Sequence, residues 1–475
     1  MSQTSPIFAV VLAGGKGTRM KSNKAKVLHT LCGAPMVNYA IEAIRPLCPE
    51  KLMVVVGHQS EEVEAILPED AEPVLQKEQL GTGDAVRVAL EHIEEEEGVL
   101  LVVNGDGPLI SDRTLGELVE RHRSADVGST VLVAELPDPS GLGRVVEDAG
   151  VVRIVEEREA TEAERGINLV NLGLYAFDLP EIRDALERID SDNGQGELYL
   201  TDALEIIGRR SRAVTYRLKD VEEANLVNDR SQLARAEEIL RRRILDAHMR
   251  NGVTVRDPTS THIEAGVEIG LDTVILPGSL LREGTRIGSE CVIGPSTDLR
   301  DTVVEDGAQV EHSVAQGAII GTGASVGPYS YLRPGTVLGK KAKVGAYCEV
   351  KNTEVGDRSK VPHLSYVGDT KIGEDANLGA GAITANYDGV NKNRTEIGDR
   401  VFVGVNTNLI APITIGEDAY IGAGSVVNKD VPSGKLAVGM PARVIRDAPG
   451  KGSGKKEEKG PEDGDWKRPR TETEG

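Results

Sequence analysis

The chain has 475 residues, which is too long for one ordinary hydrophobic core, so two or three domains are expected. Its formal net charge of -21 argues against a nucleic-acid-binding protein, because contacts with many phosphates need a basic surface. Aromatic residues make up only 3% of the chain, which also disfavours stacking platforms for single-stranded nucleic acid.

The sequence lacks the marks of export and of membrane insertion. No stretch approaches 18 apolar residues, and the apolar run near the N-terminus has no basic segment before it. The 4 cysteines form no C-x-x-C pair and indicate buried thiols in a reducing compartment, not a zinc site or a disulfide framework. We therefore expect a soluble cytoplasmic protein without nucleic-acid or membrane partners.

Residues 1–230 show strands alternating with helices. This alternation predicts a Rossmann-like, mainly parallel α/β sheet that binds ligands at the carboxyl ends of its strands. The expected strands include Ile7–Leu12, Leu52–Val56 and Val99–Val103, and the expected helices include Glu61–Leu67 and Asp84–Glu97.

A glycine-rich loop, Leu12–Met20 (LAGGKGTRM), follows the first expected strand directly. Its glycines let the backbone approach a ligand closely and turn amides toward phosphate oxygens. Lys16, Arg19 and Lys26 add positive charge, and an arginine can bind phosphate with two hydrogen bonds. The loop is neither a Walker A motif nor a G-x-G-x-x-G fingerprint, so it predicts a phosphate site of another kind.

This loop, with Lys26–His29 after it, resembles the signature of the sugar-1-phosphate nucleotidyltransferases. The segments Gln76–Gly83, Asn104–Pro108 and Gly141–Arg144 resemble further motifs of that family. The resemblance implies nucleotide and sugar contacts by Leu12, Ala13, Gly14, Gly15, Arg19, Lys26, Gln76, Gly81, Thr82, Gly143, Glu156, Asn171 and Asn228. It also implies Mg²⁺ held by Asp106 and Asn228, which suits a reaction that brings two anions together.

A helical stretch separates this half from the next. Residues 231–251 are rich in helix formers and lack glycine and proline, so they predict one helix of about six turns. It ends before Gly252, and we assign residues 231–252 to a linker helix between two domains.

From residue 263 onward an aliphatic residue recurs every six positions, often with a glycine after it. Neither a helix of period 3.6 nor a strand of period 2 keeps such a step, whereas a coil of three short strands does. The period predicts a parallel β-helix over residues 253–445. The unbroken series are Ile263, Ile269, Ile275, Leu281, Ile287, Ile293, Leu299, then Val314, Ile320, Val326, Leu332, Leu338, Val344, Val350, and finally Ile397, Val403, Leu409, Ile415, Ile421, Val427.

The hexads are interrupted twice in this half. One break lies between Val367 and Ile372, after the polar segment Gly356–Ser365, and the other is Ala385–Glu396. Insertions in a solenoid form loops on one face, often the binding face. We therefore expect the site at these breaks, with His363 in the first interruption and Asn386 in the second.

Residues 5–435 resemble the bifunctional N-acetylglucosamine-1-phosphate uridyltransferase/glucosamine-1-phosphate acetyltransferase. In the second half the resemblance rests on Tyr331–Gly335, Val350–Lys351, His363–Gly368, Asn377–Gly381 and Asn386–Gly389. It implies a left-handed β-helix, a homotrimer with acetyl sites between subunits, acetyl-CoA as donor and His363 as catalytic base. The implied glucosamine-1-phosphate contacts are Arg333, Lys351, Tyr366 and Asn377, and the implied acetyl-CoA contacts are Ala380, Asn386, Tyr387, Val405, Ala423 and Arg443.

Four positions depart from the pattern of the family. Val405 stands where a small hydroxyl residue is usual near coenzyme A, and Arg443 or another residue is expected to take the place of the closing arginine. Gly107 and Leu172 differ from the usual residues beside the metal turn and the sugar asparagine. These changes affect the expected coenzyme A contacts more than the expected reaction.

The charged segment 446–475 is expected to be disordered by itself. Its Trp466, in the string Asp465–Pro469, resembles the anchor of a tail that reaches the acetyl site of a neighbouring subunit.

The predicted function is synthesis of UDP-N-acetylglucosamine, a cell-envelope precursor. The β-helix would acetylate glucosamine 1-phosphate with acetyl-CoA, and the N-terminal domain would couple the product to UTP with Mg²⁺ and release pyrophosphate. Two alternatives stay open: a nucleotidyltransferase for another sugar, and a β-helix that is a trimer scaffold without catalysis. A three-histidine zinc site is disfavoured, because His262, His312 and His363 would lie nearly three coils apart.

Overall fold

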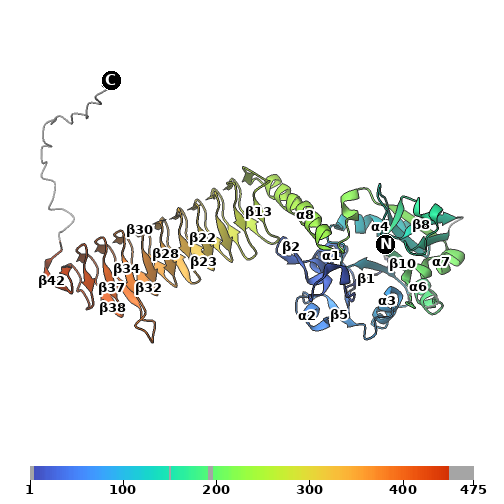
Figure 1. The fold of residues 1–475 in the computed structure, drawn as a ribbon, viewed down its shortest axis with the longest axis horizontal. Helices are drawn as coiled ribbons and strands as arrows, with labels where there is room; N and C mark the ends of the chain where they lie inside the picture. Colours follow the sequence, from blue (N-terminus) through green and yellow to red (C-terminus); the bar gives the residue numbers. More distant parts are fainter. Residues whose placement is uncertain (1–4, 149–150, 191–195, 449–475) are drawn as a thin grey trace, which may run out of the picture. The chain divides into compact units, whose positions relative to one another are not determined.

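The computed structural model describes residues 5–148, 151–190 and 196–448, so Trp466 and its tail lie outside the described residues. The described chain divides into two compact units. One runs to Ile269 and includes Pro277–Thr285, and the other comprises Gly270–Leu276 and the chain from Arg286 onward. Figure 1 shows an α/β unit, the helix α8 and a stack of short strands.

The first unit is built on one mixed sheet with the strand order β11-β7-β10-β6-β1-β4-β5. Strand β10 runs antiparallel to both of its neighbours, and β8 and β9 form an antiparallel hairpin beside it. The strands are β1 Ile7–Leu12, β4 Lys51–Val56, β5 Glu72–Leu75, β6 Val99–Asn104, β7 Ser129–Glu135, β8 Arg144–Asp148, β9 Val151–Val155, β10 Leu169–Asp178 and β11 Ala213–Arg217. The expected α/β sheet is therefore present, with antiparallel strands on one side.

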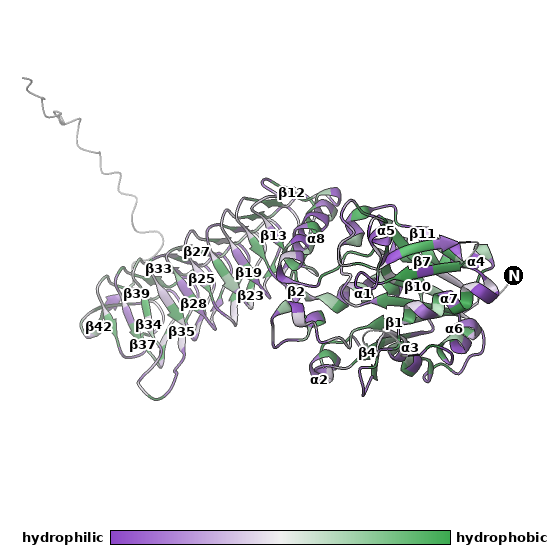
Figure 2. Cartoon of the chain, turned by 45° about the vertical axis from the view of Figure 1, so that its right-hand side comes forward, coloured by the Kyte–Doolittle hydropathy of each residue, from purple (hydrophilic) through white to green (hydrophobic). Residues whose placement is uncertain are grey.

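Helices cover both faces of this sheet, so its strands are apolar on both sides. In β1, Ala9 and Val11 belong to one hydrophobic cluster, whereas Phe8 and Val10 belong to the opposite one. Successive strand residues point to opposite faces, which explains the continuous apolar runs in the sequence. Figure 2 shows these strands as mainly hydrophobic. The helices are α1 Met36–Ile44, α2 Ser60–Glu64, α3 Thr82–Leu90, α4 Asp112–Ala125, α5 Glu162–Arg165, α6 Leu179–Leu186 and α7 Leu200–Ser211.

Two helices are shorter than the sequence suggests. Helix α3 ends at Leu90 and leaves out the run Glu94–Glu97, where successive like charges disfavour a helix. Helix α2 ends at Glu64, three residues before Leu67, which is followed by Pro68. A residue before proline is disfavoured in the helical conformation.

Helix α8, Arg230–Arg250, confirms the predicted long helix. The Asp229 side chain accepts a hydrogen bond from the Gln232 amide at 2.8 Å and caps the first turn. Only a few of its residues are buried, among them Ala236 and Leu240, which explains its largely polar composition. Within the described residues, none of the helices combines the length and the apolar character needed to cross a membrane.

The strands after α8 form the predicted parallel β-helix, with three sheets along its length. We name the sheets after one coil: the β30 sheet, the β31 sheet and the β32 sheet, from β30 Lys360–His363, β31 Tyr366–Gly368 and β32 Thr370–Ile372. Other strands near the expected site are β25 Tyr331–Leu332, β28 Glu349–Lys351, β33 Asn377–Leu378, β34 Ile383–Ala385, β35 Thr395–Ile397, β36 Phe402–Val403, β37 Asn408–Ile410, β39 Tyr420–Ile421, β41 Lys435–Gly439 and β42 Ala442–Asp447. The described strand pairings along the β-helix are parallel except the closing hairpin β41–β42, and an isolated antiparallel bridge joins Tyr387 to Lys392.

The hexad reading needs two corrections. First, Val314 is 44% exposed and Ala315 points into the interior, because the steps from Val310 to Ala315 and from Ala315 to Ile320 are each five residues long. Second, the first expected interruption is not an insertion. Strands β30, β31 and β32 follow one another without a loop, and only a single residue is missing between Val367 and Ile372.

The second interruption is real. Residues 386–394 leave the coil between β34 and β35 and form a projecting loop. His363 is therefore the last residue of a regular strand at a corner of the coil, whereas Asn386 begins the inserted loop.

Candidate active sites

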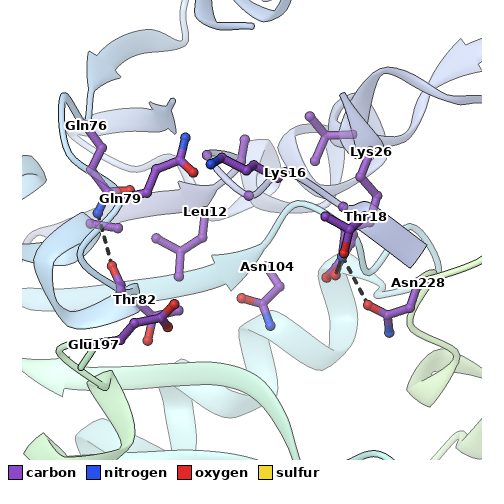
Figure 3. Close-up of a pocket in the computed structure, with 18 of the residues that line it drawn as sticks. Leu12, Lys16, Thr18, Lys26, Gln76, Gln79, Thr82, Asn104, Glu197 and Asn228 are labelled. Carbon is purple, nitrogen blue, oxygen red and sulfur yellow. Dashed lines mark hydrogen bonds and ion pairs between the residues drawn. The ribbon is translucent and has the colours of Figure 1, made fainter. Parts of the chain in front are cut away.

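A cavity of about 800 Å³ opens at the carboxyl ends of β1 and β6 in the first unit. A second cavity of about 620 Å³ adjoins it, and the two share Leu12, Thr18, Arg19, Thr82, Asn104, Asp106, Glu156, Glu197 and Asn228. Every residue that the sequence analysis assigned to nucleotide or sugar contacts lines one or both of them. The structure thus brings together segments more than two hundred residues apart (Figure 3).

The glycine loop forms one wall of the larger cavity. Gly17 has a left-handed φ of 58°, and a Cβ there would lie 2.6 Å from Lys26 Cβ. A glycine is therefore required for Lys26 to pack against the loop. In this position the Lys26 amine forms an ion pair with Asp106.

Asp106 and Asn228 lie at the floor of the site with two cations. The Asn228 side-chain oxygen accepts hydrogen bonds from Arg19 at 2.7 Å and from Lys26 at 3.2 Å. The backbone N–H of Asn228 donates to the side-chain oxygen of Gln232 in α8 at 2.7 Å, which fixes the position of Asn228. The other carboxylate oxygen of Asp106, Oδ1, is buried without a hydrogen-bond partner.

The sugar side of the site lies on the antiparallel strands. The Asn171 side chain donates to the Tyr175 hydroxyl at 2.7 Å and accepts from the Gly173 amide at 3.0 Å. The backbone N–H of Asn171 also donates to the Gly143 carbonyl at 2.9 Å, so two of the expected sugar contacts are joined by a hydrogen bond. Burial raises the pKa of the Glu156 carboxyl beside them, and the negative charges of Glu159 and Asp202 add to the effect.

Several residues on this side were not predicted from the sequence. Tyr175, Glu197 and Tyr199 line the sugar cavity, but no motif marks them. Arg144, 2% exposed, was seen only as part of a motif. Its guanidinium forms an ion pair with Glu157 at 2.6 Å and donates to the Leu142 carbonyl, which holds the loop before it in place.

In the β-helix, three of the expected coenzyme A residues, Ala380, Val405 and Ala423, form a ladder with His363 along one corner, between the β30 and β31 sheets. Backbone hydrogen bonds join its rungs. The His363 carbonyl accepts from Gly381, the Ala380 carbonyl from Asn406, and the Val405 carbonyl from Gly424, at 3.2, 2.7 and 2.8 Å. We call His363, Ala380, Val405 and Ala423 the corner ladder. Its valine side chain is 47% exposed, so the ladder presents a small, partly apolar surface.

The expected phosphate contacts lie on the outer face of the β31 sheet. Arg333 forms an ion pair with Glu349 at 2.8 Å, and Lys351 pairs in register with Gly368. A Cβ on Gly368 would lie 2.6 Å from the Tyr366 hydroxyl and 2.8 Å from the Asn386 amide nitrogen. Tyr366 and Asn386 therefore approach each other over Gly368.

Asn386 has a defined partner in the single chain. Its side-chain amide donates to Asp369 at 2.5 Å. Partial burial would raise the pKa of the Asp369 carboxyl, but hydrogen bonds from Asn352 and Asn386 and the charge of Lys351 together outweigh it and lower the pKa. Lys351 also lowers the pKa of Lys392, a basic residue of the inserted loop that the sequence analysis missed.

Three expected residues lie apart from this face. Asn377 belongs to β33 in the β30 sheet. Tyr387 is 61% exposed, and its hydroxyl donates to the Gly389 carbonyl within the inserted loop. Arg443 lies in the closing hairpin opposite Val438, and its guanidinium donates to the carbonyl of Ala442. A single chain thus does not enclose His363 with all the expected substrate contacts.

Both halves match known families. Residues 9–197 match the model of the MobA-like NTP transferase domain, and residues 394–429 match that of the bacterial transferase hexapeptide (six repeats). Three similar relatives are each named bifunctional protein GlmU. That of Rubrobacter xylanophilus is 79% identical over 468 residues, which cover 98% of each chain. That of Brevibacillus brevis is 47% identical over 93% of this chain and 96% of its own, and that of Alkaliphilus metalliredigens is 45% identical over 91% and 95%.

The two cavities at the glycine loop, the hexapeptide β-helix and this identity over nearly the whole length agree with one another. The chain belongs to the GlmU family, whose members combine a uridyltransferase and an acetyltransferase in the synthesis of UDP-N-acetylglucosamine from acetyl-CoA and UTP.

Proposed function

We propose that uridylyl transfer takes place in the paired cavities of the first unit and depends on Mg²⁺ held by Asp106 and Asn228. The observation that carries this proposal is the meeting of Asp106, Asn228, Lys26 and Arg19 at the junction of the two cavities. The nucleotide would occupy the larger cavity and the sugar phosphate the smaller one, so the reacting phosphates would meet at this junction.

The side chains present fit a magnesium ion. Asp106 Oδ1 is a buried carboxylate oxygen without a partner, and Asn228 offers an amide oxygen beside it. Among the described residues no cluster of three or more His, Cys, Asp or Glu side chains could hold a metal. Mg²⁺ commonly takes one or two protein oxygens and completes its shell with water and substrate phosphates, so two protein ligands suffice.

The other residues bind and position the phosphates. When bound, Mg²⁺ would neutralise negative charge on the phosphates of UTP. Lys26 and Arg19 would exchange their present contacts with Asp106 and Asn228 for contacts with phosphate oxygens. The glycine loop supplies backbone amides, and no covalent intermediate on the protein is needed, because positioning and charge stabilisation provide most of the catalysis in such transfers.

We propose in addition that acetyl transfer takes place beside the corner ladder with His363 as general base. The amine of glucosamine 1-phosphate must lose a proton to attack the thioester, and a neutral imidazole accepts it near neutral pH. Arg333 and Lys351 would bind the phosphate on the outer face of the β31 sheet. Acetyl-CoA would lie along Ala380, Val405 and Ala423, where small side chains leave room.

A homotrimer would complete this second site. His363 and its neighbour Leu364 are exposed in one chain, and Asn377 and Arg443 do not lie on the face that carries Arg333 and Lys351. A neighbouring copy against the corner ladder would cover these groups and exclude water. Sedimentation should give three times the chain mass, and a monomer with full acetyltransferase activity would refute this part of the proposal.

Two single substitutions test the assignment of the sites. Asp106→Ala should abolish pyrophosphate release from UTP and N-acetylglucosamine 1-phosphate but leave acetyl transfer unchanged. His363→Ala should abolish acetyl transfer and leave pyrophosphate release unchanged. If either change removed both activities in a folded protein, or if His363→Ala retained acetyl transfer at the wild-type rate, the assignment would be wrong.

A further inference from the structure

The amide of Gln76 is held on one side by two acceptors. Its nitrogen Nε2 donates to the Gly81 carbonyl at 3.1 Å (Figure 3) and to a carboxylate oxygen of Asp84 at 2.8 Å. Gln76 and Asp84 are only 5% and 4% exposed. Asp84 lies in the first turn of α3, and its other oxygen pairs with Arg87, which balances the buried charge.

These contacts determine which way the amide faces. A carbonyl and a carboxylate only accept hydrogen bonds, so each of them must accept one from the two N–H groups of Nε2. The amide oxygen is left on the opposite side, 3.3 Å from the position of a Cβ on Gly14, which lines the nucleotide cavity. In the described part of the chain no group donates to that oxygen. Gln76 therefore presents an acceptor to a ligand and has no donor left.

We propose that Asp84 is a positioning residue that fixes Gln76 as a hydrogen-bond acceptor and thereby selects uracil over cytosine. The inference rests on uridylyl transfer in this cavity. Uracil carries an N–H at N3 that can donate to the Gln76 oxygen, whereas N3 of cytosine is itself an acceptor and would face that oxygen without a proton. A site whose polar group is committed to one role rejects a ligand that leaves it unpaired.

The test is the preference for UTP over CTP, expressed as the ratio of their kcat/KM values with N-acetylglucosamine 1-phosphate. Asp84→Asn keeps the shape of the side chain, but asparagine can donate as well as accept a hydrogen bond. The Gln76 amide can then adopt the reversed orientation. We expect the ratio to fall about tenfold, which is the scale for one buried hydrogen-bonding group. Asp112→Asn makes the same change in the first turn of α4, outside both cavities, and should leave the ratio unchanged.

A double substitution separates positioning from general damage. If Asp84 acts through Gln76, then Asp84→Asn should change the ratio no further in a Gln76→Ala background, because the two residues form one unit. Pyrophosphate release from UTP, measured in the same preparation, reports whether the first unit of the variant is folded. If Asp84→Asn does not fold, Asp84→Ala provides the second test.

The outcomes distinguish this inference from the proposed function. A wild-type protein that releases no pyrophosphate from UTP would refute uridylyl transfer in this cavity. An active variant whose ratio stays within twofold of the wild type would refute the role of Asp84 alone. A further fall of the ratio in the Gln76→Ala background would also refute it, since Asp84 would then act by another route.

Discussion

Gly368→Ala is the sharpest test of the proposed acetyl site, because it adds one methyl group at a place with no room. The φ of Gly368 is not in the left-handed region, so the backbone accepts alanine. The new Cβ would lie 2.6 Å from the Tyr366 hydroxyl and 2.8 Å from the Asn386 nitrogen. Ordinary contacts begin near 3.4 Å, so the hydroxyl must retreat by about 0.8 Å and the amide by about 0.6 Å.

A displacement near 1 Å in a positioned site reduces a rate about 10²-fold, whereas overpacking lowers stability by only about 1–3 kcal/mol. We therefore expect kcat/KM for acetyl transfer to fall about 10²-fold, measured as release of the coenzyme A thiol, with uridylyl transfer unchanged. Gly116→Ala is the matched control, since nothing lies within 4 Å of its added Cβ. Wild-type acetyl transfer by Gly368→Ala would refute the placement of Tyr366 and Asn386 in the site.

Three further predictions concern the rest of the chain. Arg144→Lys keeps the charge, but a lysine cannot contact both Glu157 and the preceding loop. KM for the sugar phosphate should therefore rise about tenfold in the pyrophosphate assay. An unchanged KM would contradict the role of Arg144. Backbone N–H groups of its own loop hold the pKa of Asp388 below its usual range, so the stabilisation of the inserted loop by Asp388 is complete above that range and is lost as the pH falls through the lowered pKa. Asp388→Ala should therefore raise KM for acetyl transfer and remove this sensitivity to acid. An equal loss of uridylyl transfer would contradict this prediction. Ile372→Ala empties an inward position that is 2% exposed and should destabilise the β-helix by about 2–5 kcal/mol in thermal unfolding, whereas the outward neighbour change Lys371→Ala should cost less than about 0.5 kcal/mol.

Local patterns predicted most of the architecture. The strand Ile7–Leu12 and the long helix are close to their predicted limits, since continuous apolar runs and helix-forming stretches express local preferences. The hexad period predicted the β-helix, but it placed Val314 in the interior where Ala315 lies. A five-residue step is as compatible with the coil as a six-residue one, and only the pairing of strands shows where such a step occurs.

The site was predicted unevenly for the same reason. The glycine loop and Asp106 lie at strand ends and carry recognisable motifs, and the structure brings them together. Tyr175 and Lys392 carry no local signal, because their positions depend on an antiparallel strand and on an inserted loop. The interruption expected around His363 proved to be a regular corner, so the prediction of its local structure was wrong.

The sequence by itself determined that a glycine loop follows the first strand and that a repeating coil forms the second unit, because both depend on the spacing of residues that are close in the chain. Only the tertiary structure decided how individual polar groups face. The Gln76 amide nitrogen donates to Asp84 and to the Gly81 carbonyl, and the Asn386 amide nitrogen donates to Asp369. Such pairings depend on strand register and on the direction of side chains, and these are settled by packing across distant segments rather than by local preference.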